Sequence, residues 1–374
     1  MFWLIGCAQE GLEGWWVDVH GRVVDEAGAP LSGASVTLVT GEGAAVAQVR
    51  TNDEGSWRVP LYGTELDGNV LVGVISAEGK AEGRATWEVN LRSPETTTLR
   101  AGPGQTWYTT ARRVSTVQLA DDAAIGSVSG RVVDAVTGAP VAGAALSLQA
   151  GWNAPVGDAA VDSATSSSDG TFSFTGAPGM YTVTVAEGTE WGSARFPALL
   201  TGSGGTTTGM VAPPMEAAQL FAAVIWGSTP SDLDLHLSAP KRSGFSNGQY
   251  HLWAEEPVHP EDVPEEEQDA WMLRTDSDGY GPESLRVDAL AERGDVRLSV
   301  FDNDNVSDAT TEALSDSGAV LQLWFGEDIP RYWQVSPGEI ATLWHPVTVD
   351  VQTAVPYVVE EYSFGEDPHD DDAF

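Results

Sequence analysis

The sequence predicts an all-β protein: three antiparallel β-sandwich domains in series, followed by an acidic C-terminal tail. Short stretches in which apolar and polar residues alternate recur along the chain, as in strands with one buried face. Turn residues separate these stretches, and the 374 residues include 41 Gly and 21 Pro. No long stretch has a helical period, and the length is sufficient for two or three domains.

The first 14 residues, a short terminus and linker, predict export and a lipid anchor. Leu4-Ile5-Gly6-Cys7 resembles a bacterial lipobox, where a signal peptide is cleaved and the new N-terminal cysteine is lipidated, and Cys7 is the only cysteine. A complete signal peptide has a positive start and an apolar core of roughly 7–15 residues. Only Phe2 to Ile5 precede Gly6, without Lys or Arg. Either the true translation start lies upstream of Met1, or the match is accidental.

One pattern occurs twice in the first 200 residues. Gly21-Arg22-Val23-Val24-Asp25 and Gly130-Arg131-Val132-Val133-Asp134 are each followed by a Gly-x-Pro turn, an alternating strand and a later acidic-Gly turn. Glycine supplies the positive φ of such turns, and aspartate hydrogen-bonds its own backbone there. The repeat predicts two similar sandwiches. They span residues 15–100 and 125–200, with a turn-rich connector over 101–124 and a flexible Gly/Thr/Pro linker over 201–216.

The repeated pattern resembles the carboxypeptidase regulatory-like (transthyretin-like) domain. Its parts are Gly-Arg-Val-x-Asp, Gly-x-Pro-x-x-Gly-Ala and a turn such as Ser168-Asp169-Gly170-Thr171-Phe172. The resemblance implies a seven-stranded sandwich without catalysis of its own. It also implies a spacer, a stabiliser or a weak binder in a bacterial surface or secreted protein.

The remaining sequence predicts a third sandwich over residues 217–359 and a disordered acidic tail over 360–374. Leu220–Trp226 is apolar on both faces, as in a central strand. Residues 232–237 alternate strictly, which places their leucines in the core and their polar residues on the opposite face. Further strands are predicted over residues 250–253, 271–274, 284–289, 296–301, 320–325, 332–335 and 340–345.

This third segment resembles a YfaP-like domain, a bacterial β-domain family of uncharacterised function that is often paired with surface modules. The resemblance rests on a tryptophan-ended strand, the run Pro-Ser-Asp-Leu-Asp-Leu-His over 230–236, and Gly279-Tyr280-Gly281-Pro282-Glu283. It spans residues 217–350 and departs from the family's pattern in an acidic insertion, 255–269, which predicts a solvated loop. The resemblance implies a fold and a location, and no reaction.

Acidic residues of the third domain predict a calcium site. Calcium binds several carboxylate and carbonyl oxygens at turns that can surround it. One pair of aspartates shares a strand face, and three more acids flank a Gly-rich turn; the predicted ligands are Asp232, Asp234, Asp276, Asp278 and Glu283. Asp302 and Asp304 form a further acidic cluster at a strand end. The EF-hand pattern is absent, and the alternative is that these are ordinary turn and surface residues.

Two other patterns in the third domain do not predict a site. Asp232, Asp234 and His236, with His251, lack the ligand types and spacing that zinc sites usually have. Gly244–Gly248 matches Gly-x-Ser-x-Gly by letters only, because a nucleophile elbow needs a strand before the serine and a helix after it. No catalytic residue is therefore predicted.

A sugar contact is predicted at Trp324, which lies out of phase with the core residues Leu321, Leu323 and Phe325. An exposed aromatic ring stacks on sugars, whereas a buried one belongs to the core, and both readings stay open.

The net charge of the protein limits the classes of partner that it can bind. The formal net charge is −37, which disfavours nucleic acid and anionic lipid surfaces. The sequence thus predicts a non-enzymatic, extracytoplasmic bacterial protein of the cell envelope or outer surface, held to the membrane through Cys7. Two spacer sandwiches would present a calcium-stabilised domain that binds a protein or glycan, or that is purely structural. A glycan-binding module, or a metal-assisted hydrolase at the acidic face of the third domain, is the alternative.

Overall fold

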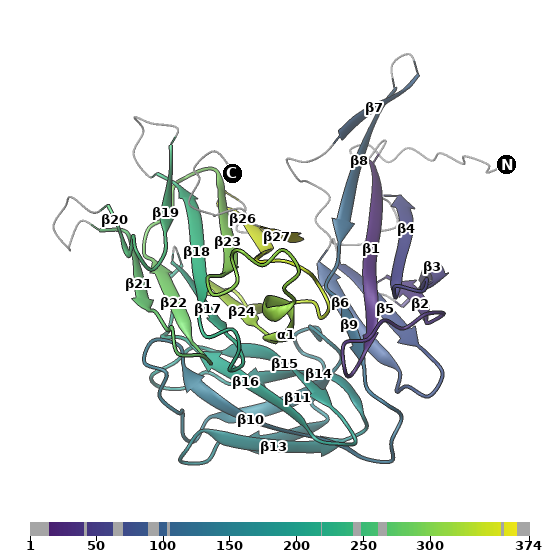
Figure 1. Cartoon of the computed structure of the whole chain (residues 1–374), viewed down its shortest axis with the longest axis horizontal. Coiled ribbons are helices and arrows are strands. Elements are labelled where there is room, and N and C mark those ends of the chain that lie inside the picture. Colours follow the sequence, from purple (N-terminus) through teal and green to yellow (C-terminus); the bar gives the residue numbers. More distant parts are fainter. Residues whose placement is uncertain are drawn as a thin grey trace.

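In a computed structural model, the part of the chain that the structure describes is almost entirely β-structure, with one short helix (Figure 1). The structure describes residues 15–40, 43–62, 70–88, 97–102, 105–217, 219–241, 248–260, 268–352 and 355–364. Its strands form six sheets, which pack in pairs around apolar cores. The predicted all-β fold class is confirmed. Cys7 and the Gly-x-Ser-x-Gly match around Ser246 lie outside the described residues.

The first sandwich follows the predicted alternation. In β2 the two residues Val36 and Leu38 are buried between less buried neighbours. One sheet has the order β4-β1-β8-β7, with β9 also on β1, and the other has the order β3-β2-β5-β6. The strands are β1 (Trp15–Asp25), β2 (Ser35–Val39), β3 (Ala45–Arg50), β4 (Ser56–Tyr62), β5 (Val70–Ser76), β6 (Gly83–Glu88), β7 (Thr97–Gly102), β8 (Gln105–Arg113) and β9 (Val117–Leu119).

The second sandwich repeats this plan. Its sheets have the orders β13-β10-β16 and β12-β11-β14-β15. In β13 the rings of Phe172 and Phe174 are both buried, as the alternation predicts. The strands are β10 (Gly126–Asp134), β11 (Ala145–Ala150), β12 (Asp162–Thr165), β13 (Thr171–Gly176), β14 (Gly179–Val185), β15 (Ala194–Leu200) and β16 (Gly205–Val211).

Two segments predicted to connect domains are instead strands. β8 and β9 lie in the predicted connector and pair in parallel with β1, while β16 lies in the predicted linker and pairs in parallel with β10. The linker prediction was wrong because Gly and Thr were interpreted as signs of flexibility. Gly209 is needed for close packing, since a Cβ there would lie 2.0 Å from the Phe196 ring.

The third sandwich is antiparallel in every strand pair that the structure describes, as predicted. Its sheets have the orders β20-β21-β22-β17-β24-β25 and β19-β18-β23-β26-β27. The leucines of β18 are fully buried between the sheets. The elements are β17 (Leu220–Ile225), β18 (Leu233–Pro240), β19 (Gln249–Leu252), β20 (Val258–His259), β21 (Ala270–Arg274), β22 (Glu283–Val287), β23 (Asp295–Asp302), α1 (Ala313–Asp316), β24 (Val320–Phe325), β25 (Arg331–Gln334), β26 (Leu343–Asp350) and β27 (Val355–Ser363).

The three sandwiches are consecutive in the chain but do not form a linear string. Figure 1 shows the first (purple to blue) and the third (green to yellow) both standing on the second (teal). β15 of the second contacts β24 and β25 of the third, and β27 of the third contacts β8 of the first. The core of the first two sandwiches continues into the third through Phe221, Trp324 and Tyr332.

Candidate functional site

The predicted metal ligands lie at one end of the third sandwich, where Glu283 joins its two sheets. Glu283 begins β22 and is 1% exposed. One carboxylate oxygen accepts a hydrogen bond from the backbone N–H of Leu235 in β18 (2.8 Å), and the other accepts one from the N–H of Asp276 (3.0 Å). The carboxylate therefore fixes the start of β18 and the turn after β21 in place.

Burial raises the pKa values of three carboxyl groups at this end of the sandwich. Burial raises the pKa of Glu283 to about 8, and the charges of Asp234 and Asp232 add to the shift against the two backbone hydrogen bonds. Burial, with Asp232 and Glu255 nearby, raises the pKa of Asp234 to about 7. Burial also raises the pKa of Asp276. With pKa values of about 8 and about 7, Glu283 and Asp234 are partly protonated near neutral pH.

The five predicted ligands do not converge into a cation site. No three Asp, Glu, His or Cys side chains in the described ranges form a group that could hold a metal. Asp276 pairs with Arg274 (2.8 Å), Asp232 accepts from the Asn303 amide (2.9 Å), and Asp278 is exposed. Because the carboxylates are used separately, the geometry of Asp232, Asp234, Asp276, Asp278 and Glu283 gives the predicted calcium site no support.

The further acidic cluster has a structural use. Asp304 accepts hydrogen bonds from the backbone N–H and hydroxyl of Ser231 (both 2.7 Å) and from the N–H of Asp232 (3.2 Å). Asp302, fully buried, accepts from the Asn305 amide (3.0 Å). The Asp304 bonds tie the loop before β18 to the loop after β23, and the Asp302 bonds hold the latter loop in shape.

Two residues of the possible zinc set, His236 and His251, contact each other. His236 Nδ1 lies 2.9 Å from His251 Nε2, and the Trp253 ring stacks on His236 with centroids 5.6 Å apart. The two histidines bond to each other rather than aiming at a common point. We did not predict this pair, although it follows from the β18–β19 hairpin, in which Ser238 lies opposite His251.

Trp324 corrects the predicted sugar contact. The ring does point away from the core of the third sandwich, as its phase predicts, but it is only 3% exposed. It packs edge-on against Phe221, with centroids 5.5 Å apart, and its indole N–H donates to the carbonyl of Ser193 (2.9 Å). The second sandwich covers this face of the sheet, so Trp324 has no free ring face for a sugar.

Buried side chains of the third sandwich make polar contacts with the second sandwich. Tyr332 of β25 is 1% exposed and reaches into the second sandwich. Its hydroxyl oxygen accepts from the Asn153 N–H (2.6 Å) and lies 3.0 Å from Thr182 Oγ1. Gln322 Nε2 donates to the carbonyls of Arg195 (3.0 Å) and Met210 (3.1 Å), and its Oε1 accepts from the Met210 N–H (2.8 Å).

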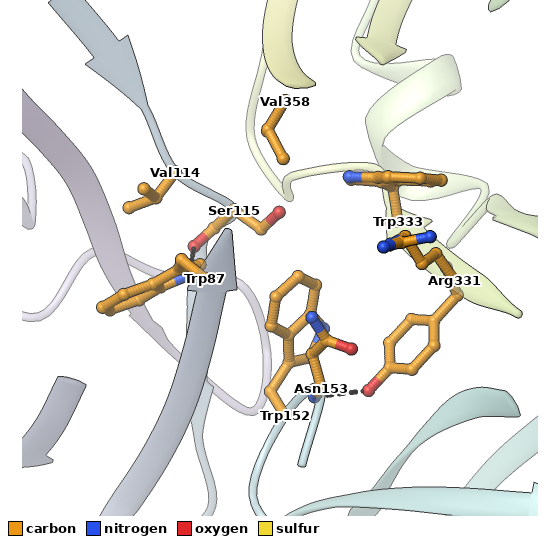
Figure 2. Close-up of a pocket in the computed structure, with 9 residues that line it drawn as sticks. Trp87, Val114, Ser115, Trp152, Asn153, Arg331, Trp333 and Val358 are labelled. Atoms are coloured by element: carbon orange, nitrogen blue, oxygen red, sulfur yellow. Dashed lines mark hydrogen bonds between the residues drawn. The ribbon is translucent and has the colours of Figure 1, made fainter. Parts of the chain in front are cut away.

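All three sandwiches meet at one junction (Figure 2). Trp152 packs edge-on against Tyr332, with centroids 5.5 Å apart. Its backbone N–H donates to the carbonyl of Arg84 (2.8 Å), and its carbonyl accepts from the Thr86 N–H (3.0 Å). The cavity that remains is about 20 Å³, room for about one water molecule. The rings of Trp87, Trp152 and Trp333, labelled in Figure 2, and that of Tyr332 therefore form a packed junction and not a ligand pocket.

The first and third sandwiches are held together by charged and polar groups. Glu360 of β27 is 1% exposed and accepts from Ser115 Oγ (2.8 Å), Tyr362 Oη (3.3 Å) and Trp344 Nε1 (3.4 Å). Burial raises its pKa to about 6. Arg113 pairs with Glu339, and its guanidinium lies 4.8 Å above the Tyr362 ring.

An open cavity of about 330 Å³ lies beside this contact, lined by His20, Gly21, Arg22, Glu54, Ser56, Arg113 and Glu339. Arg22 donates to the carbonyls of Glu54 (3.1 Å) and Pro337 (3.0 Å), so it links the two sandwiches.

Comparison with known proteins supports the assignment of the first two sandwiches. The model of the carboxypeptidase regulatory-like domain matches residues 18–102 and 127–209. The resemblance of the repeated pattern to this family is therefore confirmed, and the second match ends within β16, which lies in the predicted linker. The resemblance of the third sandwich to YfaP-like domains stays a prediction. No curated protein sequence matches the chain.

Similarity to solved structures is weak. The Bacillus anthracis TIE protein is 14% identical, with a TM-score of 0.21 over 53% of this chain and 34% of that one. The chain thus spans about a third of the length of that protein. The shaft pilin SpaA from Lactobacillus rhamnosus GG is 12% identical, with a TM-score of 0.19 over 53% and 98%. Hydroxyquinol 1,2-dioxygenase from Pseudomonas putida DLL-E4 is 12% identical, with a TM-score of 0.20 over 32% and 64%. None of these similarities bears on function.

No helix in the described part of the chain has the length and apolarity to cross a membrane.

Proposed function

We propose that this chain is a non-catalytic bacterial envelope protein in which two regulatory-like sandwiches brace a third sandwich and hold it in a fixed orientation. The observation that carries the proposal is the set of buried polar bonds between sandwiches. Tyr332 and Gln322 are fully buried and use their polar atoms on the second sandwich. Buried polar groups of this kind are costly unless each keeps its partner, so they favour one arrangement over many.

The bracing role is consistent with the kind of domain that is duplicated. The two matched segments resemble an accessory domain, and both contact the third sandwich directly. A flexible stalk would instead need long polar linkers between domains. Here the short segment between β16 and β17 follows a buried strand end, Met210 and Val211, which leaves little freedom for the third sandwich to swing.

The cooperativity of unfolding tests the bracing role. The full chain should unfold in one transition when followed by tryptophan fluorescence and by circular dichroism, because each sandwich shares buried contacts with its neighbours. Separate transitions, or early proteolytic cleavage between β16 and β17 under native conditions, would show that the sandwiches are independent.

The proposed location rests on Cys7 and on the resemblance of Leu4–Cys7 to a lipobox. Expression of the gene with the genomic sequence upstream of Met1, in the presence of labelled palmitate, tests it. The label should enter the protein and the membrane fraction, and Cys7→Ser should abolish both results. A wild-type protein without label that stays in the cytoplasm would contradict the proposed location but leave the bracing role standing.

A further inference from the structure

The most strained residue with an exposed side chain is Tyr280, in the turn before β22. Three described residues other than glycine have a left-handed backbone: Asn153 (φ 49°), Tyr280 (φ 74°) and Glu360 (φ 50°). This conformation is unfavourable for residues with a Cβ, and most of all for bulky ones. Strain of this kind persists where the surrounding structure enforces it, often at a site of function.

Asn153 and Glu360 each have a side-chain role in the fold, whereas Tyr280 does not. The Asn153 amide donates to the carbonyl of Thr86, and Glu360 accepts three hydrogen bonds between the first and third sandwiches. The side chain of Tyr280 is 63% exposed. Its ring and hydroxyl make no hydrogen bond or aromatic contact with the described residues.

The turn presents this ring on a rigid support. The N–H of Tyr280 donates to the carbonyl of Gly227, and that of Gly279 donates to the carbonyl of Ser231 (both 2.9 Å). Gly281 lies so close to Trp226 that a Cβ there would be 2.7 Å from its ring. The Trp226 indole N–H in turn donates to the carbonyl of Pro230 (3.0 Å). A rigid aromatic side chain loses little entropy when a partner binds it.

The charge around the ring favours a cationic partner. Asp278, two residues before Tyr280, is exposed, and the protein as a whole has a formal charge of −37. Asp304 and Asp232 accept hydrogen bonds from Ser231 and Asn303 in the loops that support this turn, and they add negative charge to this end of the sandwich. A cation above an aromatic face is attracted to the ring, and the exposed charge of Asp278 in the same turn adds to that attraction.

We propose that Tyr280 and Asp278 form a contact site for a basic partner protein, which places an arginine or lysine side chain over the Tyr280 ring. The attraction of the whole acidic surface increases the rate of encounter, and the rigid ring gives the contact a fixed position. The site lies on the third sandwich, the domain that the two others brace.

Titration calorimetry of the full chain with a tetra-arginine peptide, at low and at high salt, tests the proposal. Tyr280→Gly should weaken binding about two- to fivefold, the size of one exposed cation–π contact, and Tyr280→Phe should retain most of the affinity. Asp278→Asn should also weaken binding, whereas Asp328→Asn removes the same charge from another exposed position and should change it less.

Stability measurements separate binding from folding. Glycine accepts a φ of 74° but gives the unfolded chain more freedom, so the free energy of unfolding of Tyr280→Gly should stay within about 1 kcal/mol of the wild-type value. A larger loss would show that the ring serves the fold, and it would overturn the proposal. Equal peptide affinity in wild type and Tyr280→Gly would also overturn it. So would Tyr280-dependent binding of maltotetraose without Tyr280-dependent binding of the peptide.

Discussion

Removal of one hydroxyl group at the junction tests whether the sandwiches are locked together. The Tyr332 oxygen accepts from the Asn153 N–H at 2.6 Å. Thr182 Oγ1 donates to the carbonyl of Gly151 (2.9 Å) and accepts from the Ala154 N–H (2.9 Å), so the Tyr332 hydroxyl is the donor in the bond that joins them. Tyr332→Phe therefore removes a donor and an acceptor from a buried place and leaves the Asn153 N–H without its acceptor.

The expected cost follows from these bonds. A buried N–H that loses its acceptor costs about 1–3 kcal/mol, so Tyr332→Phe should lower the free energy of unfolding by about 2 kcal/mol. Tyr181→Phe is the matched control, because its hydroxyl bonds to the carbonyl of Ala177 within the second sandwich (2.9 Å). That substitution should cost about 1 kcal/mol or less, because it leaves a partly exposed acceptor.

Urea unfolding and hydrogen exchange measure the two effects. In Tyr332→Phe the amide of Asn153 should exchange faster than in the wild type, since its acceptor is gone. Exchange at Asn153 should be unchanged in Tyr181→Phe. Equal destabilisation by the two substitutions, together with unchanged exchange at Asn153, would refute the view that Tyr332 locks the second and third sandwiches.

Three further predictions concern other buried groups. Burial raises the pKa of Glu360 from 4.5 to about 6, so its contribution to stability is full below pH 4.5 and is lost as the pH rises through 6, a change of about 2 kcal/mol. Glu360→Gln should flatten the pH profile of urea unfolding in this window, and an unchanged slope would contradict the assignment. The pKa of Glu283 is raised to about 8, so the free energy of unfolding should fall further between pH 4.5 and 8. Glu283→Gln should remove that fall, although one backbone N–H then loses its acceptor. If the pH profile of this variant equals that of the wild type, Glu283 is not the source of the fall. Trp324→Ala should lower stability by about 3–5 kcal/mol, measured by urea unfolding, because the ring is buried between sandwiches, and a loss below about 1 kcal/mol would show that the ring is exposed in solution.

Much of the fold was predictable because strand alternation is a local property of the sequence. The strict alternation of residues 232–237 placed the leucines of β18 in the core, where the structure also has them. The phase of Trp324 gave its face correctly, but not its burial, because the second sandwich that covers it is distant in sequence. In the same way, β16 resembles a linker by composition and becomes a strand only because β10 lies beside it.

The site was less predictable than the fold. Sequence spacing identified Glu283 as an acid next to a Gly-rich turn, but not that it bonds to β18 in the opposite sheet. The junction residues Tyr332, Asn153 and Glu360 carry no motif, and their roles depend on contacts between domains. A positive φ cannot be seen in a sequence when the residue is not glycine, which is why Tyr280 was noticed only as part of a family-like motif.

Small-angle X-ray scattering of the full chain tests the central claim most directly, because it measures how the three sandwiches are arranged in solution. Locked sandwiches predict a curve that matches the structure and does not change with moderate salt, since buried contacts are screened little. A larger radius of gyration, with the broad Kratky plateau of domains that move on linkers, would contradict the claim.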